Sequence, residues 1–119
     1  MEARKRSLRT WYGQTVKICI DRPLGSRHQK YPDLIYGVNY GFLEDVMGGD
    51  GEGQDVYLLG VDKPVNEYTA VVIGGVFRLN DIEDKLIAVP LGKKYTKEEV
   101  SSMIDFQERY YLTEIEMIE

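Results

Sequence analysis

Apolar and polar residues alternate over residues 15–20, which is the pattern of a strand that buries one face. Three further apolar stretches also predict strands: residues 55–61, 68–79 and 86–90. The stretch 68–79 is long enough to bend at Gly74 and Gly75, where side chains are missing from the run. The chain therefore contains several short strands separated by turn residues.

One segment has the period of a helix. Thr96, with Glu99 three residues later, matches a capping box, in which each residue satisfies a free backbone amide at the helix start. An apolar stripe follows at helical spacing: Val100, Met103, Ile104 and Tyr111. Glu108 falls off this stripe, so we expect it away from the core. Residues 114–117 alternate again and are read either as a final strand or as a continuation of the helix.

Short strands followed by one late helix predict a mainly β fold, a small barrel or strongly curved sheet with the helix packed outside. The length of 119 residues, 43% of them hydrophobic, suits a single domain over residues 1–119. We expect the basic residues 1–10 to form a frayed end. No apolar stretch is long enough for a membrane helix or a secretory signal, so a cytoplasmic protein without membrane contact is expected.

The formal net charge of −5 argues against a general nucleic-acid binder, which needs a positive surface to displace counterions from phosphates. An OB-type nucleic-acid binder therefore ranks last among the functions considered.

Residues 50–60 read DGEGQDVYLLG and crowd Asp50, Glu52 and Asp55 onto a glycine-rich turn. The turn is not an EF-hand, because its sixth and twelfth positions are Asp55 and Val61 instead of glycine and glutamate. Crowded carboxylates repel one another unless protonated or bound to a cation, and Mg²⁺ prefers oxygen ligands.

A second acidic group lies downstream: Asp81, Glu83 and Asp84. Basic residues stand elsewhere: Arg22, Arg27, Lys30 and Lys85. Carboxylates gather metals, and metals with cations gather phosphate oxygens. Composition and spacing leave two interpretations open, polar turns between strands or a metal-assisted phosphate site.

Four ordered blocks are similar to a known family: residues 36–42 (YGVNYGF), 50–56 (DGEGQDV), 75–90 (GVFRLNDIEDKLIAVP) and 106–110 (FQERY). They resemble the active-site signature of the soluble family I inorganic pyrophosphatases. The resemblance implies a five-stranded OB-like barrel with outer helices. It also implies a site for several Mg²⁺ ions, with Mn²⁺ as a substitute, that splits pyrophosphate into two phosphates. Family members commonly assemble, so it implies a homo-oligomer as well.

The resemblance also implies roles for single residues. The metal ligands would be Asp50, Asp55, Asp81 and either Glu83 or Asp84. Glu52 stands where the family has an aspartate that takes a proton from the attacking water. Contacts to phosphate oxygens would come from Lys85, Tyr40 and Tyr110, with Tyr36 nearby.

The chain departs from the family pattern at several positions. Glu52 is one methylene longer than the family's aspartate, and Gly53 replaces a proline. Tyr111 stands where the family has a lysine. The upstream hairpin that carries a lysine, a glutamate and an arginine of the family's site has no counterpart. A basic loop is our candidate for the missing charge, with solvated surface as the alternative: Arg22, Arg27, His28 and Lys30.

The first interpretation is therefore a Mg²⁺-dependent enzyme that hydrolyses pyrophosphate with a metal-activated water. The alternatives are a hydrolase of another small phosphoanhydride and a non-catalytic domain that binds metal and phosphate.

Overall fold

The computed structural model describes residues 1–47 and 53–118, with residues 44–47 described by their backbone alone. In chain order the elements are α1 (Glu2–Arg9), β1 (Thr15–Arg22), β2 (Asn39–Met47), β3 (Gly53–Leu58), β4 (Glu67–Arg78), β5 (Lys85–Val89), α2 (Lys97–Glu108) and β6 (Thr113–Met117). The strands follow the order β1-β2-β3-β5-β4-β6, and an additional pairing of β1 with β4 closes the first five into a barrel. The predicted mainly β barrel with an outer C-terminal helix is confirmed.

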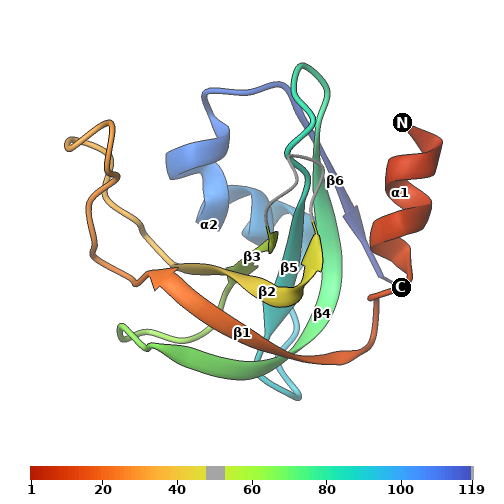
Figure 1. Ribbon diagram of the computed structural model, residues 1–119, viewed down its shortest axis with the longest axis horizontal. Helices are drawn as coiled ribbons and strands as arrows, with labels where there is room; N and C mark the ends of the chain where they lie inside the picture. Colours follow the sequence, from red (N-terminus) through yellow and green to blue (C-terminus); the bar gives the residue numbers. More distant parts are fainter. Residues whose placement is uncertain (48–52, 119) are drawn as a thin grey trace.

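The long strand β4 serves two parts of the sheet. Its first half pairs with β1, and its second half pairs with β6 outside the barrel (Figure 1). The ladder between β4 and β5 shifts register between Val72 and Gly74, where the sequence predicted a bend. A side chain at Gly74 would meet the carbonyl oxygen of Glu116 at 2.3 Å, so glycine allows β6 to approach.

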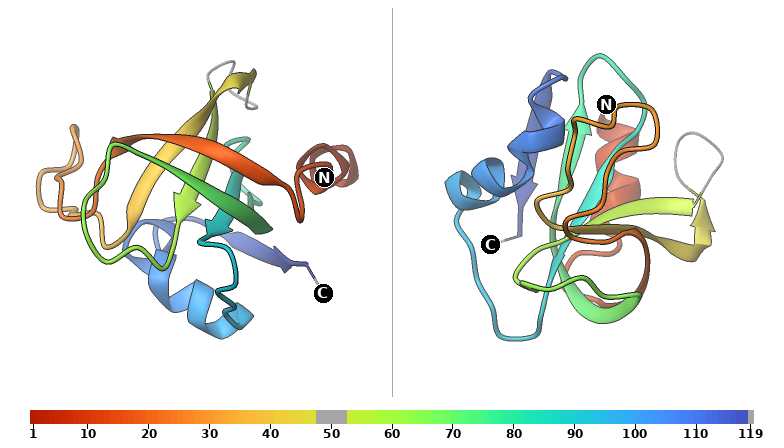
Figure 2. Two further views of the ribbon diagram at one scale, coloured as in Figure 1. Left: turned by 90° about the horizontal axis from the view of Figure 1, so that it is seen from below. Right: turned by 90° about the vertical axis from the view of Figure 1, so that its left-hand side faces the viewer.

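Two apolar layers lie on opposite faces of the barrel wall. Val56, Leu58 and Leu86 belong to the inner layer, whereas Tyr57 and Ile87 belong to the outer layer, because successive strand residues point to opposite faces. Helix α2 lies outside the barrel (Figure 2). Its buried residues Val100 and Ile104 belong to the outer layer. Strands β3 and β5 are therefore apolar on both faces, which explains their continuous apolar runs.

Helix α2 begins as the sequence predicted. Thr96 accepts from the amide of Glu99 at 3.1 Å, and the Glu99 carboxylate accepts from the amide of Thr96 at 2.8 Å. The helix ends at Glu108, so Tyr111 lies outside it. Glu108 is buried, contrary to the interpretation that placed it off the packed face. The open choice for the last residues is decided, because they form strand β6.

The basic N-terminal segment forms helix α1, whereas the sequence favoured a frayed end. Leu8 packs into the inner layer, and Arg4 donates to the carboxylate of Asp84 and to the backbone carbonyls of Arg78 and Asp81. The helix lies on the opposite side of the barrel from the loop of residues 23–38 (Figure 1). Glu2 in its first turn and Arg6 and Arg9 in its last turn suit a helix, but the sequence interpretation had no apolar stripe to identify it, because Leu8 is its one buried residue.

Candidate active site

A cavity of about 710 Å³ lies on the outer face of the barrel, between the sheet, the loop of residues 23–38 and the end of α2. Seven residues predicted for the site line it: Arg22, Tyr36, Tyr40, Asp55, Glu83, Lys85 and Tyr110. Four other predicted residues do not line it: Arg27, Lys30, Asp81 and Asp84. Asp50 and Glu52 lie outside the described residues. Most of the residues that the resemblance implied thus meet at one cavity.

Asp55 and Lys85 form an ion pair at the centre of this lining. Strands β3 and β5 run parallel with Val56 opposite Leu86. Asp55 and Lys85 precede these two residues, so they are neighbours on the same face of the sheet. Lys85 Nζ donates to Oδ2 of Asp55 at 2.6 Å. The lysine side chain is only 3% exposed, whereas Asp55 is 26% exposed and faces the open part of the cavity. A fixed positive charge therefore stands beside a carboxylate that solvent reaches.

A group of tyrosine rings in tilted and edge-to-face contact forms one wall. Tyr40 lies with its ring centroid 5.6 Å from that of Tyr36 and 5.0 Å from that of Tyr57, and Lys85 Nζ lies 5.5 Å from its ring centroid. Burial, and next the charge of Asp55, raises the pKa of Tyr40 well above its ordinary value. Tyr40 is therefore a neutral hydroxyl, which can donate a hydrogen bond to an anion.

The residues beside Tyr40 fix its position. A side chain at Gly41 would meet the carbonyl oxygen of Cys19 at 1.9 Å, so only glycine lets β1 and β2 approach this closely here. The side chain of Asn39 accepts from the amide of Leu24 at 2.9 Å and donates to the carbonyl of Lys63 at 2.9 Å. These two motif residues hold backbone in place and do not line the cavity.

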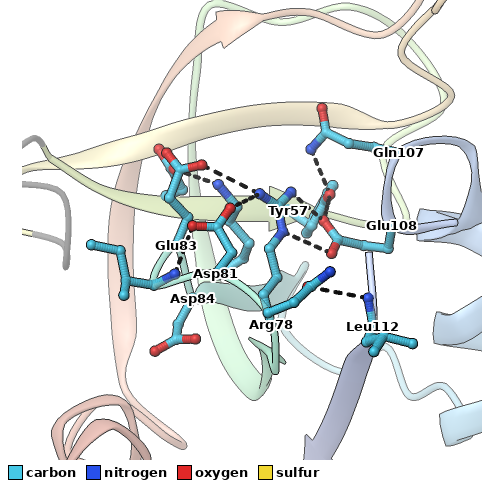
Figure 3. Close-up of polar contacts among 12 residues, drawn as sticks. Tyr57, Arg78, Asp81, Glu83, Asp84, Gln107, Glu108 and Leu112 are labelled. Carbon is cyan, nitrogen blue, oxygen red and sulfur yellow. Dashed lines mark hydrogen bonds and ion pairs between the residues drawn. The ribbon is translucent and has the colours of Figure 1, made fainter. Parts of the chain in front are cut away.

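Arg78 occupies the floor of the cavity and is only 2% exposed. Its Nε and Nη2 donate to the two carboxylate oxygens of Glu108 at 3.1 and 2.8 Å. Tyr57 donates to the same carboxylate, and Gln107 donates to the Tyr57 hydroxyl at 2.6 Å. The ring of Tyr111 covers the guanidinium, with 3.6 Å between the guanidinium carbon and the ring centroid. This network ties β3 and β4 to the end of α2 (Figure 3).

The downstream acidic residues point in different directions. Nη1 of Arg78 lies 3.5 Å from Asp81 Oδ2 and 3.3 Å from Glu83 Oε2. Asp84 points away from these two side chains (Figure 3) and pairs with Arg4 of α1. Of the two residues that the resemblance offered for one carboxylate position, Glu83 is the one that lines the cavity.

The loop of residues 23–38 folds back on itself and covers the other side of the cavity. Backbone bonds join Gly25 to Tyr36 and His28 to Leu34 at 2.8 and 2.9 Å. The loop and its approach bring Arg22 and His28 to the lining. Arg27 instead donates to the carbonyl of Pro32 at 3.0 Å and so closes the turn of the loop.

The predicted metal ligands are all carboxylates, which suit Mg²⁺ or Mn²⁺ better than a soft metal. Among the side chains that the structure describes, residues 1–43 and 53–118, no three histidine, cysteine or acidic side chains form a group that could hold a metal ion. Asp55 contacts Lys85, and Asp81 and Glu83 contact Arg78, so these carboxylates are already paired with cations of the chain.

Sequence reasoning missed the network of Arg78 and Glu108. One signal was available, because Arg78 directly follows the apolar residues of the second half of β4, and a charged residue there needs a partner if it is buried. No pattern in the sequence identified Glu108 as that partner, since the two lie 30 positions apart.

The sequence profile of a family described as inorganic pyrophosphatase matches residues 9–117. The chain therefore belongs to the inorganic pyrophosphatase family, and the resemblance to its family I members is confirmed. The predicted class, an inorganic diphosphatase-like hydrolase, agrees with this membership.

Solved structures of pyrophosphatases have the same fold. The inorganic pyrophosphatase of Ehrlichia chaffeensis matches at a TM-score of 0.67 and 18% identity, over 87% of this chain and 86% of that one. The enzyme of Neisseria gonorrhoeae matches at 0.61 and 21% identity, over 82% and 74%. The enzyme of Thermus thermophilus matches at 0.59 and 16% identity, over 86% and 80%. No helix in the described part of the chain is long and apolar enough to span a membrane.

Proposed function

We propose that this protein hydrolyses inorganic pyrophosphate to two phosphates and needs a divalent cation, Mg²⁺ or Mn²⁺, to do so. The observation that carries the proposal is the pair of Asp55 and Lys85 at the cavity, on strands that lie within the family match. Pyrophosphate repels a nucleophile through its own negative charges, so its hydrolysis requires fixed positive charge and an activated water.

The side chains of the lining have suitable chemistry for binding phosphate. Lys85 contributes an amine that already contacts a carboxylate, and Arg22 contributes a guanidinium. Tyr40 is a neutral hydroxyl donor, and Tyr36 and Tyr110 present further hydroxyls to the same space. We assign the binding and orientation of phosphate oxygens to these five residues.

We propose Asp50 and Asp55 as the carboxylates that hold the cation, and Glu52 as the base that accepts a proton from the attacking water. A bound Mg²⁺ would supply charge neutralisation and a water of lowered pKa. Glu52 is longer than the family's aspartate, and an error of about 1 Å at such a position can cost about a hundredfold in rate. We therefore expect slower turnover than an aspartate would give.

Phosphate release from pyrophosphate, measured with Mg²⁺ or Mn²⁺ for the wild type and for Asp55→Asn, tests the proposal. We expect turnover in the wild type and a loss of about a hundredfold or more in the variant. Asp105→Asn is the control, because Asp105 pairs with Arg109 on the exposed face of α2 and should not affect turnover. Wild-type protein that binds metal without releasing phosphate would contradict the proposal.

A non-catalytic domain that binds metal and phosphate is the second candidate. The observation in its favour is that the described carboxylates of the site contact Lys85 and Arg78. Such a domain would be stabilised by Mg²⁺ with phosphate, because a ligand that binds only the folded state raises the melting temperature. A non-catalytic domain would show that stabilisation without releasing phosphate from pyrophosphate. A hydrolase of another phosphoanhydride would release phosphate from that compound instead.

Three parts of the sequence interpretation stay predictions: a cytoplasmic location, a homo-oligomer and no binding of nucleic acid. The net charge of −5 supports the last of these, and an oligonucleotide should therefore leave the melting temperature unchanged.

A further inference from the structure

Arg78 is a buried cation among three carboxylates. Glu108 binds it from one side, and Asp81 and Glu83 approach it from the other (Figure 3). Its side chain is 3% exposed, so the charge is shielded from solvent and acts strongly on its neighbours. Asp81 and Glu83 are the same carboxylates that the sequence assigned to a metal ion.

The contacts of Arg78 hold its guanidinium in one orientation. Two of its nitrogens bond to Glu108, and Tyr111 covers one face. Nη1 is left to point toward Asp81 and Glu83, at 3.5 and 3.3 Å. Moving the guanidinium would leave the buried carboxylate of Glu108 without its cation, and a buried charge without its partner is strongly destabilising.

The charge of Arg78 is permanent. A guanidinium does not lose its proton in proteins, so it keeps its full positive charge at this position. A divalent cation bound between Asp81 and Glu83 would therefore lie within a few ångströms of a positive charge that neither moves nor loses its proton. Repulsion between the two cations at such a distance in a shielded site opposes the attraction of the two partly exposed carboxylates for the divalent ion.

We propose that Arg78 is a resident cation that takes the place of a divalent ion between Asp81 and Glu83. The chain then binds one ion fewer at this cavity than its acidic residues suggest. Tyr111 belongs to this arrangement, because its flat ring can cover a guanidinium at the position where the family has a lysine. The inference deepens the proposed function, since it concerns how the same cavity is neutralised.

The first test measures Mn²⁺ binding to the full chain by the electron paramagnetic resonance of free Mn²⁺. The double variant Asp81→Asn with Glu83→Gln should bind the same number of ions as the wild type, with affinity within about threefold. Loss of an ion, or affinity weakened by about tenfold or more, would show that these carboxylates are metal ligands and would overturn the proposal. Both residues lie in a surface turn, so we expect the variant to fold.

The second test removes the cation. Arg78→Gln combined with Glu108→Gln deletes both buried charges together and so leaves no unpaired one. This variant should bind an additional Mn²⁺ ion, and adding Asp81→Asn with Glu83→Gln should abolish the addition. A folded variant that binds no additional ion would overturn the proposal.

Two controls separate charge from structure. Arg78→Lys keeps the charge and should keep the wild-type number of Mn²⁺ ions, so a gained ion would contradict the proposal. Arg4→Gln combined with Asp84→Asn loosens the same turn without freeing a carboxylate, because Arg4 contacts the carbonyls of Arg78 and Asp81 and the carboxylate of Asp84 from α1. An additional Mn²⁺ ion in this double variant would attribute the gain to a loosened turn and not to Arg78.

These outcomes do not depend on turnover. If the wild type releases no phosphate, the proposed function fails, yet the Arg78 variants still decide whether a cation of the chain occupies this position. If the wild type releases phosphate and Asp81→Asn with Glu83→Gln loses an ion, the proposed function stands and the resident cation is refuted.

Discussion

Lys85 Nζ lies 2.6 Å from Asp55 Oδ2, although 30 positions separate the two residues along the chain. The contact follows from the parallel pairing of β3 with β5, in which Val56 faces Leu86. Because Lys85 is almost fully buried and Asp55 is not, removing Asp55 and removing Lys85 should lower the free energy of unfolding by different amounts.

Asp55→Asn leaves the buried ammonium of Lys85 without its charged partner, and we expect it to lower the free energy of unfolding by about 2–3 kcal/mol. Lys85→Met leaves a carboxylate that water reaches, and we expect a cost of about 1 kcal/mol. Urea denaturation of both single variants and the double variant measures the coupling, which should be about 1–2 kcal/mol. Additive costs would contradict the pairing.

Glu108→Gln should be strongly destabilising, by about 2–4 kcal/mol, because Arg78 keeps its charge but loses its buried partner. Asp105→Asn is the matched control on the same helix, where the pair with Arg109 is more than half exposed. It should cost less than about 0.5 kcal/mol. Equal losses in thermal or urea denaturation would contradict the buried network.

Arg22→Ala and Arg27→Ala separate the two arginines of the basic loop. Arg22 lines the cavity, so its loss should weaken phosphate binding by about tenfold. Arg27 contacts the carbonyl of Pro32, and its loss should change phosphate affinity by less than about twofold. Isothermal titration with inorganic phosphate measures both, and a similar loss for the two variants would be inconsistent with the structure.

His28 should make stability depend on pH. Burial, and next the charges of Arg22 and Lys30, lowers its pKa below the ordinary value of 6.5. The unfolded chain then binds a proton at a higher pH than the folded chain does. The stabilising contribution of neutral His28 is therefore full above pH 6.5 and is lost as the pH falls through the folded-state pKa.

The comparison with His28→Asn isolates this effect, since His28 is the only histidine of the chain. The Nδ1 atom of His28 accepts from the amides of Lys30 and Tyr31 at 3.0 and 3.3 Å, and the asparagine oxygen is a comparable acceptor. The stability of the wild type should decline more steeply than that of the variant between pH 7 and pH 5, as followed by urea denaturation. Parallel curves would show that the lowered pKa has no effect on folding.

The grouping of the candidate site came from the family resemblance of the YGVNYGF, DGEGQDV and KLIAVP blocks. The structure places Tyr40, Asp55 and Lys85 of these blocks at one cavity, and their roles there stay predictions. Arg27 and Lys30 were chosen from the same basic loop as Arg22, but only its backbone bonds decide which side chain faces the cavity. The roles of Asp50 and Glu52 stay predictions.

The sequence by itself determined the strands β1, β3, β4 and β5 and the start of α2, since alternation and a capping box are local signals. It missed β2, whose glycine and acidic residues break the alternation and whose pairing comes from neighbours. It also missed α1, because Leu8 and Arg4 hold that helix through contacts with residues distant in sequence.

Tertiary structure alone decided the electrostatics of the cavity. Whether Asp84 faces a ligand or Arg4, and whether Arg78 reaches solvent or Glu108, depends on which elements pack together. The sequence does not show whether a charged side chain is solvated or paired with another charge. Burial decides between the two, because a charge that is removed from water without a partner strongly destabilises the fold.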